Sequence, residues 1–177
     1  MEIAEPPVAR FLFASRAFAW IWLVVRIYVG YQWLMAGWEK FTSTAWVGPQ
    51  AGSALSGFLS GAMQKATGPH PDVGGWYVWF LNQVVVPHAA VFSYIVTYGE
   101  LLVGIALVLG AFTGIAAFAG AFMNFNYLFA GTVSINPLLA LAEIFLVLAW
   151  RNAGWLGLDR WLLPTLGVPW KNPVGRN

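Results

Sequence analysis

The chain has 177 residues, of which 59% are hydrophobic and only 9% are charged. Soluble domains carry roughly 25% charged residues, so this composition excludes an ordinary soluble protein and indicates a one-domain integral membrane protein. The net charge of +2 does not indicate nucleic-acid binding, and the lack of cysteine excludes a disulfide, a thiolate metal ligand and a redox-active thiol.

The N-terminal segment predicts a cytoplasmic tail that leads into a retained helix. Glu2 and Glu5 precede the first basic residues, which is not typical of a signal peptide. The apolar segment that follows is too long for the hydrophobic region of a signal peptide, and it ends without a clear small-residue cleavage site.

Four segments are predicted to cross the membrane, because a helix needs about 20 apolar residues to span about 30 Å of hydrocarbon. They lie at about residues 18–38, 92–112, 114–131 and 135–150. Short connections join the last three segments, and short loops favour antiparallel neighbours. The expected fold is therefore an all-α, integral membrane, four-helix up-down-up-down bundle in a single domain, residues 1–177.

A long outer segment, residues 39–91, is expected between the first two spans. Its first part is rich in Gly, Ser and Pro, which argues against a continuous span. Its second part, WYVWFLNQVVVPHAAVF, is apolar and aromatic but is interrupted by Pro87 and His88. We interpret it as an interfacial helix, because aromatic residues favour that depth. A fifth, kinked span is the alternative.

The distribution of basic residues predicts that both termini are cytoplasmic. With four spans, six basic residues fall on the side of the termini and two on the other side. The six are Arg10, Arg16, Arg151, Arg160, Lys171 and Arg176, and the two are Lys40 and Lys65. The outer segment then lies on the opposite side of the membrane from a cytoplasmic tail at residues 151–177.

Each predicted span carries a stripe of small or polar residues at the spacing i, i+4, i+7, i+11, which places them along one helical face. The stripes are Arg26, Gly30, Trp33 and Gly37; Glu100, Gly104, Leu107 and Ala111; Gly120, Asn124, Tyr127 and Gly131; and Asn136, Ala140, Glu143 and Val147. Small residues let transmembrane helices approach closely, so these faces are expected to point toward one another.

Three ionisable residues inside the predicted spans form the candidate catalytic cluster: Arg26, Glu100 and Glu143. With a helix rise of about 1.5 Å per residue, counted from the end of each span, the three residues lie within about 6 Å of the same depth in the membrane. We therefore expect Arg26 to pair with Glu100 or Glu143, and the remaining carboxyl to exchange protons. The structural alternative is that the buried charges only fix the helix register.

A second, weaker set of residues is expected to contact substrate or quinone. It comprises Lys40, His88, Asn124 and Tyr127. For Asn124 and Tyr127, packing and hydrogen bonding between helices is the favoured alternative to ligand contact. His70, Asp72 and His88 could form a metal site, but this set is too sparse for a metal motif, and no metal or nucleotide cofactor is expected. After the last span, RNAGWLGLDRWLLP predicts an interfacial anchor, with Asp159 capping or salt-bridging a short turn.

The order of motifs resembles the DoxX/DoxD family of small bacterial and archaeal membrane proteins. The residues that carry the resemblance are VVRIYVGYQWLMAGWEKF, then YGELLVGIALVLGAFTGIAA, MNFNYLFAG and AGWLGLDRWLLP. The long outer segment favours the DoxD-like branch, which is similar to the large, membrane-embedded subunit of thiosulfate:quinone oxidoreductase. The resemblance implies a cell (inner) membrane location, quinone as substrate, oxidation of thiosulfate to tetrathionate, and a small partner subunit.

Two further functions stay open at this stage. A non-catalytic accessory or scaffold subunit of a larger respiratory or photosynthetic membrane complex is favoured by the lack of any redox motif in the sequence. A small-solute or proton transporter would use the same buried charges, but the sequence shows no internal repeat. Fold alone does not distinguish these functions.

Overall fold

The computed structural model describes residues 5–167, and these residues contain helices and turns but no strand. The long helices are α2 (Ala19–Phe41), α5 (Ala89–Leu109), α6 (Thr113–Phe129) and α7 (Asn136–Leu148). The shorter elements are α1 (Pro7–Ala14), η1 (Arg16–Phe18), α3 (Ser53–Gln64), α4 (Gly75–Phe80), η2 (Leu81–Val85), η3 (Val86–His88) and α8 (Asp159–Thr165). Part of the predicted tail, residues 168–177 with Lys171 and Arg176, lies outside the described residues.

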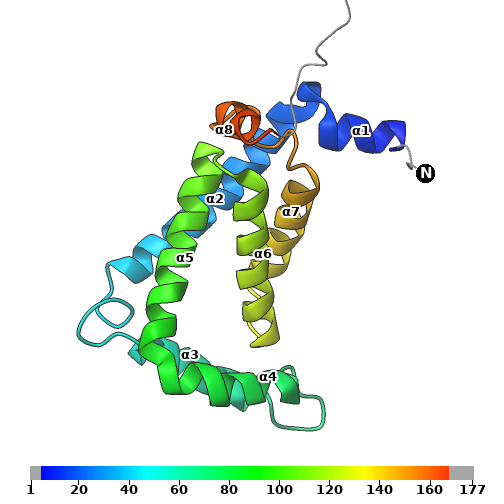
Figure 1. The fold of residues 1–177 in the computed structure, drawn as a ribbon. Helices are drawn as coiled ribbons and strands as arrows, with labels where there is room; N and C mark the ends of the chain where they lie inside the picture. The colour runs from blue at the N-terminus through cyan, green and yellow to red at the C-terminus, as the bar shows by residue number, and fades with distance from the viewer. Residues whose placement is uncertain (1–4, 168–177) are drawn as a thin grey trace, which may run out of the picture.

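The four long helices occupy the four predicted helical segments, with ends that differ from the predicted ones by at most three residues. Their chain directions alternate: α2 and α6 run away from the end that carries α1 and α8, whereas α5 and α7 return to it (Figure 1). Helix α2 packs on α5 and α7, and α6 packs on α5 and α7. The shared core contains Val29, Trp33, Leu107, Ala117 and Leu146.

Helix α5 begins and ends about three residues earlier than predicted, for local reasons. Pro87 lacks a backbone N–H and interrupts the ladder just before Ala89. At the other end Gly110 has φ +67°, a left-handed conformation that stops the helix.

The outer faces of the long helices are apolar, which is the pattern of a protein surrounded by lipid. Large exposed hydrophobic side chains include Val24, Leu102, Ile115, Phe118 and Leu141. Two helical stretches, Arg16–Phe41 and Gly75–Leu109, are long and apolar enough to cross a membrane, and α7 is a shorter apolar helix. An apolar exterior of this extent would be unstable in water.

Helices α2 and α5 approach each other closely through the predicted glycines. A Cβ atom on Gly30 would lie 2.9 Å from Val108 N, one on Gly37 would lie 2.7 Å from Leu101 N, and one on Gly104 would lie 2.5 Å from Leu34 N. Side chains at these three positions would push the helices apart. The prediction that the small-residue faces of these two helices meet is therefore confirmed.

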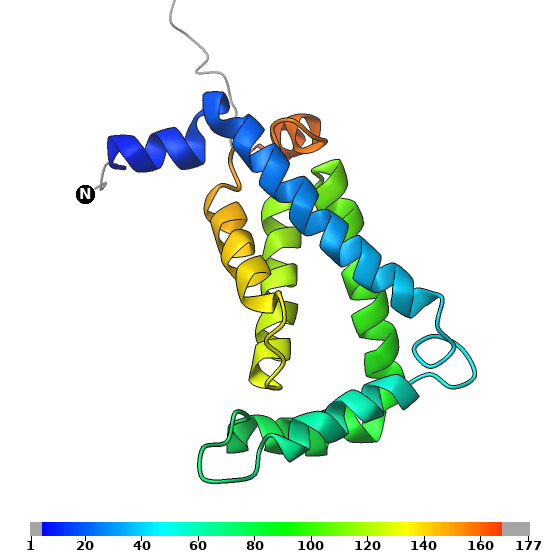
Figure 2. The ribbon, with the colours of Figure 1, turned by 180° about the vertical axis from the view of Figure 1, so that it is seen from behind.

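The predicted outer segment folds into helices that lie across one end of the molecule. Helix α3 and the stretch from α4 to η3 run roughly perpendicular to α5, at the end opposite to α1 and α8 (Figures 1 and 2). The helical stretch Gly75–Leu109 bends near Pro87. A second apolar core holds this segment together, and it includes Leu55, Leu59, Val73, Tyr77 and Leu81.

Asp159 is fully buried and caps the start of α6 rather than its own turn. Its carboxylate accepts hydrogen bonds from the backbone N–H groups of Phe112, at 2.5 Å, and Thr113, at 2.9 Å. The first N–H groups of a helix have no intrahelical partner, so a carboxylate here satisfies them and complements the helix dipole. The segment after α7 thus fixes the turn between α5 and α6.

Candidate functional site

A cavity of about 700 Å³ lies between α2, α5, α6 and the start of α7, and α3 contributes to its wall. We call it the polar cavity. Its polar wall includes Glu39, Lys40, Glu100, Asn124 and Tyr127. Its remaining wall is largely aromatic and apolar, with Trp33, Trp38, Trp46, Phe58 and Leu139 among the lining residues. Such a combination of an apolar wall with a few polar groups is typical of small-molecule sites.

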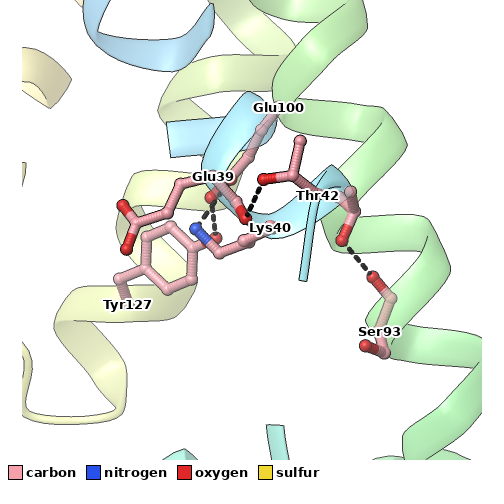
Figure 3. A network of polar contacts seen from close by, with 7 residues as sticks. Glu39, Lys40, Thr42, Ser93, Glu100 and Tyr127 are labelled. Carbon is pink, nitrogen blue, oxygen red and sulfur yellow. Dashed lines mark hydrogen bonds and ion pairs between the residues drawn. The ribbon is translucent and has the colours of Figure 1, made fainter. Parts of the chain in front are cut away.

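The first polar group in this wall is centred on Glu100. Lys40 Nζ, near the end of α2, lies 2.8 Å from Glu100 Oε2 on α5. Tyr127 on α6 donates its hydroxyl hydrogen to Glu100 Oε1 at 2.6 Å. Figure 3 shows Lys40 and Tyr127 both reaching Glu100 from different helices. Three helices therefore contribute one charged, hydrogen-bonded unit to the cavity wall.

The second polar group is centred on Glu143, which is fully buried in α7. The indole N–H of Trp33 donates to Glu143 Oε1, and the amide of Asn124 donates to Oε2 at 2.7 Å. Gly120 makes room for this contact, because a Cβ atom there would overlap Glu143 and lie 3.0 Å from Trp33 Nε1. Glu143 is not among the residues that line the polar cavity. It acts behind the wall by holding Trp33 and Asn124.

Asn124 has an unused hydrogen-bond acceptor. Its side chain is fully buried and lines the polar cavity, and its Oδ1 has no hydrogen-bond partner among residues 5–167. The amide nitrogen must face Glu143, since a carboxylate accepts but cannot donate. A buried acceptor without a partner is costly, and this oxygen is itself enclosed, so a ligand hydroxyl could reach it only after a small shift of the cavity wall.

The predicted ion pair between Arg26 and Glu100 or Glu143 is wrong. Arg26 is buried, but its guanidinium donates to the carbonyl oxygens of Leu107 at 2.8 Å and Leu156 at 3.1 Å. Leu107 lies in the last turn of α5, which ends at Leu109, and there its carbonyl oxygen accepts a longer, 3.3 Å hydrogen bond from Gly110 N–H in addition to the one from the guanidinium. These carbonyls, together with the electrostatic interaction with Asp159, compensate the charge.

The register of α2 on α5 explains why the pair does not form. Gly30 faces Val108 and Gly37 faces Leu101. Antiparallel packing in this register places Arg26 beside the end of α5 and Glu100 beside Gly37. The two charges are separated by about 11 residues of α2, or ~16 Å of helix rise. Arg26 does not line the polar cavity.

His88 does not join the other predicted contacts. It is exposed, its Nδ1 lies 2.9 Å from the carbonyl oxygen of Val84, and it lines neither the polar cavity nor the apolar groove described below. Within residues 5–167 no group of three or more His, Asp or Glu side chains could hold a metal ion. His70, Asp72 and His88 therefore do not form the alternative metal site.

Sequence reasoning missed several residues of the cavity wall. Trp46 and Phe58 come from the outer segment, and Glu39 precedes Lys40 on α2. Ser93 Oγ donates to the carbonyl oxygen of Trp46 at 2.7 Å, which ties the loop to α5. Figure 3 includes Ser93 beside this network. No local sequence signal identifies Trp46 or Phe58, because their contact with the site depends on how the outer segment folds back.

A family model described as DoxX matches residues 21–132, which is more than half of the chain. The chain belongs to the DoxX family. Members of the DoxX family are generally membrane proteins, in agreement with the two helical stretches long and apolar enough to span a bilayer. No curated protein and no solved structure matches the chain. The DoxX match includes Lys40, Glu100, Asn124 and Tyr127 but ends before Glu143.

Proposed function

We propose that the protein is a membrane subunit that binds a quinone in the polar cavity and takes part in its reduction. The observation that carries this proposal is the cavity itself: about 700 Å³, aromatic walls, and the charged unit of Lys40, Glu100 and Tyr127 at one side. A quinone ring needs an apolar, flat-walled site with polar groups at its two oxygens.

Each polar group in the wall has a role in this proposal. The ammonium of Lys40 donates a hydrogen bond to a quinone oxygen and stabilises the negative charge that develops there during reduction. Glu100 and Tyr127, which are hydrogen-bonded to each other, supply and recover protons. After a small shift of the cavity wall exposes it, the unpartnered Oδ1 of Asn124 accepts a hydrogen bond from the hydroxyl of the reduced ring. Glu143 positions Asn124 and Trp33.

The electron donor in this proposal is thiosulfate, as the resemblance to thiosulfate:quinone oxidoreductase implies. Two thiosulfate ions join through a new sulfur–sulfur bond to form tetrathionate and release two electrons. One quinone takes up these two electrons and two protons and becomes the quinol. The chain has no cysteine to carry electrons, so thiosulfate reacts directly with quinone or a small partner subunit carries the electrons.

For the topology we propose that α2, α5, α6 and α7 are four spans with both termini in the cytoplasm of a bacterium or archaeon. The end that carries α1 and α8 bears Arg10, Arg16, Arg151 and Arg160. The opposite end bears Lys40 and Lys65. This asymmetry supports the orientation, since cytoplasmic segments are enriched in Lys and Arg. The helices α3 and α4 then lie along the outer surface of the membrane.

The test is quinone binding and thiosulfate-dependent quinone reduction by protein purified gently in detergent. Wild-type protein is compared with Glu100→Gln, Tyr127→Phe and two matched controls, Asp72→Asn and Tyr31→Phe. Asp72 is exposed in a loop, and Tyr31 is exposed on α2; neither lines the cavity. Removal of one positioned proton donor or acceptor typically costs about 10²–10⁴-fold in rate, so the two cavity variants are expected to lose turnover and the controls to keep it.

The same experiment separates the enzyme from its alternative. Quinone binding without reduction, restored by co-purified partners, places the electron carrier in a partner subunit and keeps the quinone site. Absence of quinone binding by the chain, both alone and with its partners, rejects the proposal. It would then favour the accessory-subunit hypothesis, in which Lys40 and Glu100 only hold helices together.

A further inference from the structure

Beside the polar cavity lies a second, apolar space, which we call the apolar groove. Its volume is about 470 Å³, and its walls come from α3, the stretch from α4 to η2, α5 and α6. Typical lining residues are Leu59, Leu81, Phe92, Val103, Ala119 and Met123. Three further lining residues, Ile95, Leu102 and Phe122, are 58%, 67% and 63% exposed on the outer faces of α5 and α6. The groove therefore opens toward the surface that lipid covers.

The polar groups that line the groove are already occupied within the protein. Tyr77 donates its hydroxyl hydrogen to the carbonyl oxygen of Asn126 at 2.9 Å, and this hydroxyl also lies 3.1 Å from Asn126 Oδ1. Asn126 Nδ2 donates to the carbonyl oxygen of Phe122 at 2.8 Å. The groove thus offers little hydrogen bonding to a polar ligand, which would be desolvated there without compensation. Its chemistry fits a hydrocarbon chain.

The groove and the polar cavity share a wall. Leu55, Phe58, Val96 and Tyr127 line both spaces. The ring of Tyr127 packs edge-to-face on Phe58, with centroids 6.1 Å apart, while its hydroxyl faces Glu100. An amphiphilic molecule with a polar ring on one side of this wall has a hydrocarbon site directly on the other side.

We infer that the apolar groove holds the polyprenyl tail of the quinone whose ring occupies the polar cavity. This inference rests on the proposed function, and it adds that the substrate is a long-tailed, membrane-soluble quinone rather than a water-soluble one. The adjacency of the two spaces, which share four lining residues, favours the tail of that same molecule over the acyl chain of a separate lipid.

The selectivity of the groove comes from shape. A tail that leaves lipid for the groove exchanges one apolar environment for another, so transfer itself contributes little. Close packing decides whether the tail fits. Gly99 faces the groove, and a Cβ atom there would already lie 3.3 Å from Met123 Sδ. A larger side chain at Gly99, or at Ala119 on the opposite helix, fills space that the tail needs.

The test compares two probes, a naphthoquinone with a polyprenyl tail and the same ring with a methyl group in place of the tail. Binding is measured by gel filtration at equilibrium in detergent, with the bound quinone quantified by absorbance. The variants are Gly99→Leu and Ala119→Leu, one on each wall of the groove. The control is Ile115→Phe, which enlarges a side chain on α6 that is 70% exposed and lines neither space.

Both groove variants are expected to weaken binding of the tailed probe by at least about tenfold, which corresponds to about 1.4 kcal/mol. The tail-less probe is expected to bind all variants like wild type, and the control to bind both probes like wild type. Using two variants on different helices guards against a folding defect, because Gly99 adjoins Glu100 whereas Ala119 does not.

Three results would overturn the inference. Unchanged affinity for the tailed probe in both variants means that the tail lies elsewhere. An equal loss for both probes in both variants means that the groove supports the cavity only structurally. Retained phospholipid that both variants displace, with tailed-quinone binding intact, assigns the groove to an acyl chain. Failure of wild-type protein to bind either probe instead rejects the proposed quinone site, and the tail site with it.

Discussion

Lys40 and Glu100 form an ion pair between the last turn of α2 and the middle of α5, with 2.8 Å between Nζ and Oε2. The carboxylate is 1% exposed and the lysine side chain 20% exposed. The pair therefore joins a partly exposed ammonium to an almost fully buried carboxylate, and both residues belong to the wall of the polar cavity. Its free energy depends on both partners being present, because a buried charge without a partner is costly.

A double-mutant cycle on this pair is expected to show strong coupling. Lys40→Met alone leaves Glu100 buried without its cation. It should therefore lower the free energy of unfolding more than the double variant Lys40→Met/Glu100→Gln does. The expected coupling is about 1–3 kcal/mol, measured from thermal unfolding in detergent. Additive effects of the two substitutions would show that the pair contributes nothing beyond its individual side chains.

Arg26→Met is expected to lower stability while leaving quinone binding per folded molecule unchanged. Hydrogen bonds to charged groups contribute about 1.5–3 kcal/mol, and Arg26 makes several to the carbonyl oxygens of Leu107, Val108 and Leu156. Arg10→Met on exposed α1 is the control and should change the unfolding temperature little. A variant that unfolds like wild type but no longer binds quinone would place Arg26 in the site after all.

Gly104→Ala is expected to destabilise the pairing of α2 and α5. Its new Cβ atom would lie 2.5 Å from Leu34 N, and such overpacking costs about 1–3 kcal/mol. Gly57→Ala in α3 is the matched control, because a Cβ atom there meets nothing within 4 Å. Helix propensity alone predicts a gain of about 0.5–1 kcal/mol for the control. Unfolding curves of the two variants should shift in opposite directions, and a shared direction would contradict the packing argument.

Asp159→Ala is expected to loosen the turn between α5 and α6. Loss of a helix cap costs about 0.5–2 kcal/mol, and here two backbone N–H groups, those of Phe112 and Thr113, lose their acceptor. Hydrogen exchange of these two amides should accelerate. Asp72→Ala, in an exposed loop, should leave them protected, and equal exchange in both variants would show that the cap is dispensable.

Local patterns were sufficient to predict where the long helices lie and which faces they bury. The helix positions follow from lengths of apolar sequence, and the buried Gly30, Gly37 and Gly104 follow from helical spacing. Whether all four helices cross the membrane stays a prediction, since α6 has 17 residues and α7 has 13.

The pairing of polar residues needed information that one helix does not contain. The position of Arg26 relative to Glu100 depends on the register between α2 and α5, which interhelical packing sets. The depth estimate treated each span independently and so brought the two charges to one level. The contributions of Trp46 and Phe58 depend on how the outer segment folds across the helices. Asn124 and Tyr127, by contrast, lie where their helical stripe predicted.

The cap made by Asp159 also fixes the start of α6 as a point about which the helix could rotate. Helices α5 and α6 are fixed to each other at their connecting turn and lie farther apart toward α3 and α4 (Figure 1). Helix α6 has 17 residues and is therefore about 25 Å long, so a rotation of ~5° about the turn moves its far end by about 2 Å. A rotation of this size would leave the two hydrogen bonds at the turn intact, but the hydrogen bonds from Tyr77 to Asn126 O and from Lys65 to Gly131 O tie the far end of α6 to the outer segment, so that segment would have to move with it.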